Sequence, residues 1–306
     1  MFNTAKKNVP VQKVEAFSSS FEPYELHVLR EDLIHPHVSG NKFRKLKYNI
    51  KEAKLQKKSS LLTFGGAFSN HIAATAAAGK ETGLATIGVI RGEELINSIN
   101  DNPTLFFAQQ CGMQFHFVDR ETYKQKTEPL FLEQLENKFG DFYVLPEGGT
   151  NHLAVKGCEE ILSAALHDFD YLCVSVGTGG TLAGLVRAAK EHQKVLGFSA
   201  LKGTFQQSEV KKYTSKTHFE ILDDYCFGGY GKIDAVLVRF MNNFTSKTNI
   251  PLDPVYTGKM MYGIFEMMEQ RKFKENSRIL AIHTGGLQGI AGMNQLLKKK
   301  QLPQIE

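Results

Sequence analysis

The sequence predicts an α/β fold with two open, twisted, mostly parallel sheets flanked by helices. Short apolar, β-rich runs alternate with longer segments of helical spacing, a rhythm typical of parallel strands joined by crossover helices. The runs fall into two sets, at about residues 60–150 and 170–285, more strands than one doubly wound sheet comfortably holds. The predicted strands are Leu26–Leu29, Leu61–Phe64, Ala85–Ile90, Gln114–Val118, Phe142–Leu145, Tyr171–Val176, Val195–Ala200, Phe219–Leu222 and Arg278–His283.

Two segments between these strands carry specific helix signals. Apolar residues recur at helical spacing after Lys42. In NPTLFFAQQCG, Asn102 is a cap residue, Pro103 takes the first helical position and Gly112 ends the helix. Both segments therefore fit crossover helices between parallel strands.

Composition excludes several classes of protein. The chain of 306 residues is long enough for one large domain or two modest ones, and no stretch reaches the length of a membrane span. The start, MFNTAKKNVP, lacks the apolar core of a secretory signal. Four scattered cysteines without a CxxC pair indicate neither a disulfide framework nor a zinc site, so we expect a cytoplasmic protein with no metal. A net charge of +5, with the basic run 298–300 at a helix end, does not indicate nucleic-acid binding.

The clearest binding signal is VSVGTGGTLAGL, where a buried-type strand ends in a glycine turn and a helix begins. Backbone N–H groups at a helix N-terminus bind phosphate, and glycines allow its close approach. No lysine follows as a Walker loop requires, and Leu182 stands where a Rossmann fingerprint needs its third glycine. The turn predicts a compact phosphate site, and a plain glycine-rich turn is the alternative. The expected phosphate residues are Gly177, Thr178, Gly179, Gly180 and Thr181.

A second glycine turn, TFGGAFSNHIAATAAAGK, also leads from a strand into a helix. Ser69, Asn70 and His71 present side chains and N–H groups at one helix mouth, which suits a carboxylate or another anion. The segment is not the GxSxG elbow of hydrolases, because no glycine flanks Ser69 in the required positions. Taken alone, Ser69 is more simply explained as a helix cap.

Lys42 stands out in HPHVSGNKFRKLKYNI, directly after a Ser-Gly-Asn turn and at the start of a helix. The positive end of a helix and several neighbouring cations both favour loss of its proton. A deprotonated lysine is a nucleophile. Further along, DPVYTGK places Tyr256 and Thr257 before a methionine-rich helix, and FGGYGK contains Tyr230. Each tyrosine taken singly is more often a packing residue.

Six segments together resemble one known family. SGNKFRKLKYN, GGAFSNH, VGTGGTLAGL, GGYG, PVYTGK and HTGG follow in this order. A nucleophilic lysine, a phosphate cup, an anion site and ring-contacting tyrosines are the parts of a pyridoxal phosphate enzyme. The pattern resembles the 1-aminocyclopropane-1-carboxylate deaminase/D-cysteine desulfhydrase family of tryptophan synthase β-like enzymes, from about residue 20 to 295. It departs in its somewhat short chain, and PEGGTNHLAVKG, at 146–157, has no assigned role.

The resemblance implies a fold, a cofactor and residue roles. The fold would comprise a large cofactor-binding domain, residues 1–47 and 153–306, and a small inserted α/β domain, residues 48–152, and family members are commonly homodimers. Lys42 would hold pyridoxal 5'-phosphate covalently and later move the Cα proton of a small amino-acid substrate. Lys45 would assist the phosphate cup, Asn70 would bond the ring hydroxyl, Tyr256 would lie against the ring, and Thr257 would face the ring nitrogen. Ser69, Asn70, His71 and Tyr230 would surround the substrate, and the catalytic set would be Lys42, Ser69, Tyr230 and Tyr256.

Thr257 favours one of two reactions. Family members that open the cyclopropane ring have glutamate at this position, which keeps the ring nitrogen protonated, whereas a threonine hydroxyl cannot. Ring opening has no good leaving group, while β-elimination from cysteine expels a thiolate. We therefore expect D-cysteine to be converted into pyruvate, ammonia and hydrogen sulfide, with deamination of the cyclopropane amino acid as the alternative.

Two other classes remain open from the sequence. A nucleotide-dependent oxidoreductase is disfavoured by the incomplete Rossmann fingerprint. A pyridoxal phosphate carrier or regulator without turnover is disfavoured by the presence of Ser69, Tyr230 and Tyr256 together.

Overall fold

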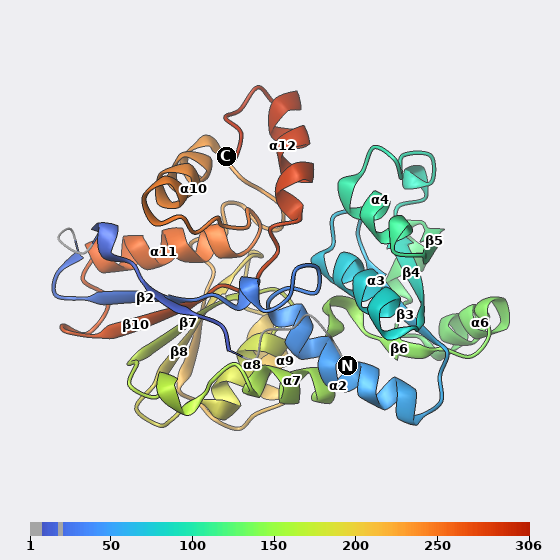
Figure 1. Ribbon diagram of the computed structural model, residues 1–306, viewed down its shortest axis with the longest axis horizontal. Coiled ribbons are helices and arrows are strands. Elements are labelled where there is room, and N and C mark those ends of the chain that lie inside the picture. Colours follow the sequence, from blue (N-terminus) through green and yellow to red (C-terminus); the bar gives the residue numbers. More distant parts are fainter. Residues whose placement is uncertain (1–7, 18–20) are drawn as a thin grey trace.

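The computed structural model describes residues 8–17 and 21–306 and contains two sheets (Figure 1). Helix α2 runs between them in Figure 1 and packs against α7 and α3. The predicted class, α/β with two mostly parallel sheets flanked by helices, is confirmed. The helices are α2 (Asn41–Leu55), α3 (Asn70–Thr82), α4 (Pro103–Gln110), α5 (Arg120–Lys124), α6 (Pro129–Phe139), α7 (His152–Glu159), α8 (Gly180–Ala188), α9 (Gln206–Lys211), α10 (Ala235–Thr248), α11 (Thr257–Glu269) and α12 (Gly289–Lys299).

The larger sheet has six strands in the order β1-β2-β10-β7-β8-β9. Only β1 is antiparallel, to β2. Along β10, Ile279 and Ala281 pack in the core with α10, α11 and α12, while Leu280 and Ile282 pack in the core with α7, α8 and α9. Burial on both faces explains why these strands read as continuous apolar runs. The strands are β1 (Val11–Lys13), β2 (Glu25–Leu29), β7 (Tyr171–Val176), β8 (Lys194–Ser199), β9 (Phe219–Leu222) and β10 (Arg278–Ile282).

The smaller sheet has four parallel strands in the order β5-β4-β3-β6. Leu61 packs in the core with α2 and α3, whereas Leu62 and Phe64 pack with α5 and α6. Ile90 extends the first of these layers toward α4. The strands are β3 (Ser60–Gly65), β4 (Ala85–Arg91), β5 (Met113–Val118) and β6 (Tyr143–Leu145).

The helix signals of the NPTLFFAQQCG segment are confirmed. The Asn102 side chain accepts hydrogen bonds from the amides of Thr104 and Leu105, and Pro103 is the first residue of α4. The helix ends at Gln110, and Gly112 has a φ of +88°. The local chemistry of this segment is therefore enough to set both helix ends.

One strand, β1, was not predicted. It has three residues at the edge of the larger sheet, and its side chains are mostly exposed. A segment this short and polar shows neither alternation nor an apolar run. Its place is set by pairing with β2 alone.

The predicted division into two domains stays a prediction. The strands of the smaller sheet all lie between residues 60 and 145, inside the proposed insertion. The proposed boundary at residue 48 falls inside α2, which continues unbroken from 41 to 55. In the described part of the chain, no helix combines the length and the apolar character needed to cross a bilayer.

Helices α2, α7 and α8 pack at backbone contact through two glycines. An ideal Cβ at Gly157, on α7, would lie 1.9 Å from the carbonyl oxygen of Arg44 on α2. One at Gly184, on α8, would lie 2.5 Å from Cβ of Cys158 and 2.7 Å from the carbonyl oxygen of Val155 on α7. Only glycine permits this approach. Helix α7 therefore lies between α2, which carries Lys42, and α8, which follows the glycine turn.

This packing predicts a large cost for adding one methyl group. Gly157→Ala and Gly184→Ala should each destabilise the fold by about 1–3 kcal/mol or more, because backbone atoms must move. The matched control is Gly289→Ala, also in a helix, where the nearest atoms to an added Cβ lie 3.8 and 4.0 Å away. Urea unfolding measures the difference. Equal stability of all three variants would contradict the glycine contacts.

Candidate active site

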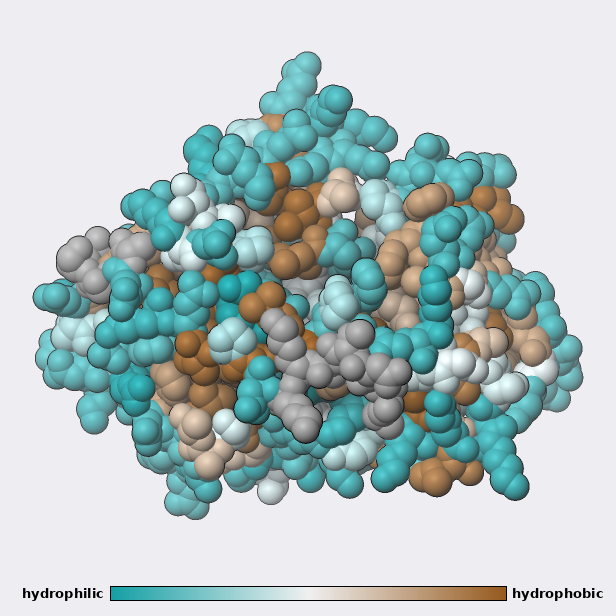
Figure 2. All heavy atoms as spheres, in the orientation of Figure 1, coloured by the Kyte–Doolittle hydropathy of each residue, from teal (hydrophilic) through white to brown (hydrophobic). Residues whose placement is uncertain are grey.

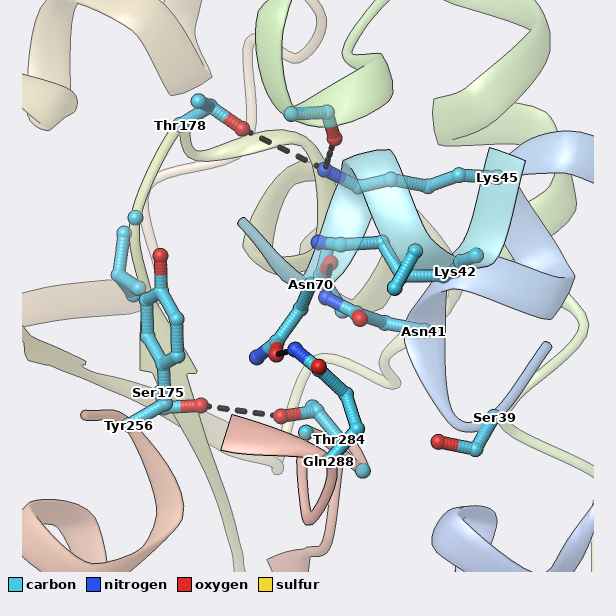
Figure 3. A pocket seen from close by; sticks show the side chains of 18 of the residues that line it. Ser39, Asn41, Lys42, Lys45, Asn70, Ser175, Thr178, Tyr256, Thr284 and Gln288 are labelled. Carbon is cyan, nitrogen blue, oxygen red and sulfur yellow. Dashed lines mark hydrogen bonds between the residues drawn. The ribbon is translucent and has the colours of Figure 1, made fainter. Parts of the chain in front are cut away.

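The cavity lies where the carboxyl ends of strands from both sheets meet, the usual binding edge of parallel sheets. It has about 700 Å³ of empty space, part of which is open to solvent. The turns that follow β7 and β10 line it together with the starts of α2 and α3 (Figure 3). None of the described residues that line it is an aspartate or a glutamate. Its polar lining consists of His37, Ser39, Asn41, Lys42, Lys45, Asn70, Ser175, Thr178, Thr181, Tyr256, Thr284 and Gln288.

The Ser-Gly-Asn turn before α2 is fixed by backbone contact with the turn after β10. Gly40 has a φ of +59°, and a Cβ there would lie 1.9 Å from the carbonyl oxygen of Thr284. The amide of Asn41 donates to the same oxygen at 3.3 Å, and its side-chain amide donates to Oγ1 of Thr181 at 2.8 Å. Glycine is therefore required at position 40, and the turn sets where Lys42 enters the cavity.

Lys42 has the electrostatic character of a nucleophile. Burial and, as a smaller cause, the nearby ammonium of Lys45 together lower its pKa to about 7. Neither lysine forms an ion pair with a carboxylate among the described residues. The neighbouring cation was expected from the sequence, whereas the larger cause, burial, required the fold.

The turn from Gly177 to Thr181 forms an open anion site at the start of α8. Gly179 is the N-cap residue, with a φ of +82°, and no side chain caps this helix. Its first amides therefore have no capping partner and can bind an anion. The hydroxyl groups of Thr178 and Thr181 border the same cavity. Gly180 packs against Thr150, 2.7 Å from the place of an added Cβ.

The side chain of Lys45 lies beside this anion site and connects it to the PEGGTN stretch, residues 146–151. It is 2% exposed, and its Nζ donates to the carbonyl oxygen of Gly148 and to Oγ1 of Thr150, both at 2.9 Å, and to Oγ1 of Thr178 at 3.4 Å. Oγ1 of Thr150 and Oγ1 of Thr178 are 2.6 Å apart. The stretch without an assigned role therefore supplies the far wall of the cup, and burial lowers the pKa of Lys45 to about 8.

The start of α3 separates the three residues predicted there. Ser69 is the N-cap, and its Oγ accepts the amide of Ile72, so its hydroxyl proton stays available. Asn70 borders the cavity. His71 is 1% exposed and does not line the cavity; its Nε2 donates to Oγ1 of Thr63, which in turn donates to the carbonyl oxygen of Leu145. Burial lowers the pKa of His71 well below its usual value, so its ring is neutral.

The DPVYTGK turn places Tyr256 at the cavity and Thr257 behind it. Oδ1 of Asp253 accepts the amides of Tyr256 at 2.6 Å and Thr257 at 3.0 Å. Oγ1 of Thr257 accepts the amide of Asp253 at 2.7 Å, and Thr257 is fully buried and does not line the cavity. Burial raises the pKa of Asp253 to about 6 and that of Tyr256 well above its usual value.

Tyr230 lies at the outer edge of this region. Its ring meets that of Tyr256 edge-on, with centroids 6.2 Å apart, and the residue is 47% exposed. It does not line the cavity itself. The structure thus brings the two predicted tyrosines together, with Tyr256 as the inner one.

The sequence reasoning gave no site role to six polar lining residues, namely His37, Ser39, Asn41, Ser175, Thr284 and Gln288. Oγ of Ser175 and Oγ1 of Thr284 are 3.1 Å apart at the ends of β7 and β10 (Figure 3). Gln288 donates to Oδ1 of Asn70 and accepts from Oγ1 of Thr104 at 2.9 Å, so it joins α12 to α3 and α4. The HTGGLQG turn was recognised as a glycine turn, but only the fold shows that Thr284 and Gln288 face the cavity.

The residues present fit a phosphorylated aldehyde cofactor. The buried Lys45, the half-buried Lys42 and the uncapped helix amides suit a dianionic phosphate. A lysine with a lowered pKa suits attack on an aldehyde carbon. The absence of carboxylates from the described lining removes repulsion of the phosphate.

Comparison with known proteins defines the class. The chain belongs to the pyridoxal-phosphate dependent enzymes, whose family model matches residues 3–285. It is 32% identical to a putative 1-aminocyclopropane-1-carboxylate deaminase of Thermotoga maritima, over 95% of this chain and 97% of that one. It is 31% identical to a bifunctional D-cysteine desulfhydrase/1-aminocyclopropane-1-carboxylate deaminase of Arabidopsis thaliana, over 87% and 73%. The solved structure of a homologue of 1-aminocyclopropane-1-carboxylate (ACC) deaminase matches with a TM-score of 0.85 and 28% identity, over 97% of this chain and 95% of that one. The predicted cofactor and the enzyme class are confirmed.

The lowered pKa of Lys42 predicts its chemistry in the cofactor-free protein. Its amine should react with cyanate at a rate that rises with pH and is half-maximal near pH 7, because only the neutral amine reacts. Lys45→Met should move this midpoint upward by removing a neighbouring positive charge. Peptide mapping measures modification of each lysine. After reconstitution and borohydride reduction, the cofactor should be found on Lys42, and a label on Lys45 or Lys47 would refute the assignment.

The cup predicts weaker cofactor retention in Thr181→Ala. The loss should correspond to one or two charge-assisted hydrogen bonds, on the order of 1.5–3 kcal/mol each. Cofactor absorbance after dialysis measures retention. Ser208→Ala, an exposed hydroxyl on α9, is the control and should retain the cofactor as wild type does. Unchanged retention in folded Thr181→Ala would count against the site.

Proposed function

We propose that this enzyme eliminates the β-substituent and the amino group of a small D-amino acid, with D-cysteine as the leading substrate. The products are pyruvate, ammonia and hydrogen sulfide, and one water is consumed. The observation that carries the proposal is the lining of the cavity, which has hydroxyl groups and no carboxylate among its described residues.

The lining bears on the strength of the electron sink. Bound pyridoxal phosphate draws electrons from the substrate Cα–H bond into its ring. A carboxylate beside the ring nitrogen would keep that nitrogen protonated and strengthen the withdrawal, whereas hydroxyl groups do not. Ser175 and Thr284 are hydroxyl candidates in addition to Thr257, which lies behind the surface. Such a site suits substrates with a good leaving group, such as a thiolate.

Each residue of the site receives a role. Lys42 would hold the cofactor and then carry the Cα proton on Nζ, for which its lowered pKa supports a neutral amine. Lys45 and the cup at 177–181 would bind the phosphate. Asn70 would bond the ring hydroxyl and Tyr256 would lie against the ring. Ser69 and Tyr230, which lie outside the cavity lining, would approach the substrate from its edge. His71, buried and bonded to Thr63, supports the start of α3 from behind.

A second candidate, deamination of 1-aminocyclopropane-1-carboxylate, is favoured by the name of the Thermotoga maritima relative. The Arabidopsis thaliana relative is named for both activities. The two reactions share the same binding groups and differ in the demand they place on the electron sink. The lack of a carboxylate among the described lining residues favours the desulfhydrase reaction.

We also propose a cytoplasmic homodimer with a small inserted domain at residues 48–152. The four cysteines are free thiols, three of them buried, which suits a reducing compartment. Size-exclusion chromatography with light scattering tests the dimer.

The proposal predicts a clear order of substrates. Wild-type enzyme should turn over D-cysteine or β-chloro-D-alanine well, and 1-aminocyclopropane-1-carboxylate poorly or not at all. Pyruvate and 2-oxobutyrate release are measured side by side. L-cysteine serves as the stereochemical control.

If kcat/KM for the cyclopropane substrate equals or exceeds that for D-cysteine, the desulfhydrase proposal is wrong and the deaminase proposal replaces it. Absence of keto acid from every β-substituted amino acid, with cofactor bound, would instead favour a carrier or regulator.

A further inference from the structure

Lys259 is a buried cation that the proposed reaction does not use. It lies in the first turn of α11, is 1% exposed, and donates from Nζ to the carbonyl oxygens of Cys226 and Gly229, both at 2.8 Å. No carboxylate pairs with it among the ion pairs of the described residues. Burial lowers its pKa to about 8, and a helix N-terminus disfavours a cation. The position is costly, and the two loop carbonyls are its compensation.

The loop that supplies these carbonyls carries Tyr230. The amide of Gly229 donates to the carbonyl oxygen of Cys226 at 3.0 Å, and the amide of Lys232 donates to that of Gly229 at 3.1 Å. Each carbonyl therefore closes a turn and also accepts from Lys259, and Tyr230 lies in the second of these turns, residues 229–232. Tyr230 is 47% exposed, so its side chain is only partly packed. Four loop residues have positive φ, namely Phe227, Gly228, Gly229 and Gly231.

The same helix end carries the inner tyrosine. Tyr256 is the N-cap residue of α11, three residues before Lys259. The edge-on contact of Tyr230 with Tyr256, centroids 6.2 Å apart, is therefore made between this helix end and the loop that Lys259 holds. We propose that Lys259 is a positioning residue that holds Tyr230 against Tyr256 at the edge of the cavity. The inference rests on the proposed function of Tyr230.

Simple packing is the competing explanation. A methionine has nearly the length of lysine and fills the same space, but it has no donor for the carbonyls of Cys226 and Gly229. Lys259→Met therefore separates the two explanations. The matched control is Lys232→Met, an exposed lysine in the same loop.

Hydrogen exchange tests the contact without substrate or cofactor. In cofactor-free Lys259→Met, amides of residues 226–232 should exchange at least tenfold faster than in wild type, and those of β7 and β10 should be unchanged. Lys232→Met should match wild type throughout. Unchanged exchange in the loop of Lys259→Met would overturn the proposal.

A double-mutant cycle tests the role in catalysis. Lys259→Met should lower kcat on the order of 100-fold, as expected for a displaced catalytic group, with cofactor retention unchanged. In a Tyr230→Phe background the same change should cost less than threefold, since the hydroxyl it positions is already gone. Equal losses in both backgrounds, or a wild-type kcat in Tyr230→Phe, would overturn the proposal.

The cycle is run with whichever amino acid gives wild-type enzyme the most keto acid. Failure of D-cysteine as substrate is thus seen in wild type alone and is distinct from failure of this inference. If Lys259→Met does not fold, Lys259→Gln keeps an amide donor and should show the same pattern with smaller effects. Loss of the fold in both variants would contradict a role confined to the loop.

Discussion

The site depends on the contact between two backbone turns, one at Gly40 and the other at Thr284. Because position 40 has no side chain, the start of α2 lies directly against the turn that ends β10. Asn41 then reaches Thr181, at the first turn of α8. The start of α2 thereby fixes three parts of the site relative to one another, although they come from distant parts of the chain. These parts are the amine of Lys42, the hydroxyl group of Thr284 and the phosphate cup at 177–181.

Charge is distributed unevenly along α2, and the difference separates architecture from binding. Arg44 is paired with the buried carboxylate of Glu31 at 2.7 Å, whereas Lys42 and Lys45 face the cavity without such partners. When both lysines are protonated, their ammonium groups oppose each other's charge, and an anion bound nearby relieves this. Binding of a phosphorylated cofactor to the folded state alone therefore stabilises the fold. Figure 2 shows hydrophilic and hydrophobic residues interspersed on the face in view.

The sequence was sufficient for nine of the ten strands in the described part of the chain and for the capped starts of α3 and α4, because buried parallel strands and cap residues leave local patterns. It was also sufficient to select Lys42 as a lysine whose pKa is lowered by a neighbouring positive charge. It was insufficient where a side chain's direction depends on a turn. The hydroxyl of Thr257 is taken by the Asp253 turn, and His71 is turned toward Thr63, so neither reaches the cavity. Thr284 lines the cavity because its turn packs against the turn at Gly40. These two turns are far apart in the sequence, so no short motif predicts their contact.

Helix α2 buries two different faces at once. Lys42, Lys45 and Asn49 recur at intervals of three and four and form a polar face, while the adjacent apolar face includes Leu46 and Ile50 in the core of the smaller sheet. Each residue in an α-helix advances by about 100°. Deletion of one residue inside α2 would turn the downstream part of the polar face into the apolar core. Homologous chains should therefore vary in length before and after this helix but keep its length. The same helical spacing places Lys42 and Lys45 at the cavity and Leu46 and Ile50 in the core.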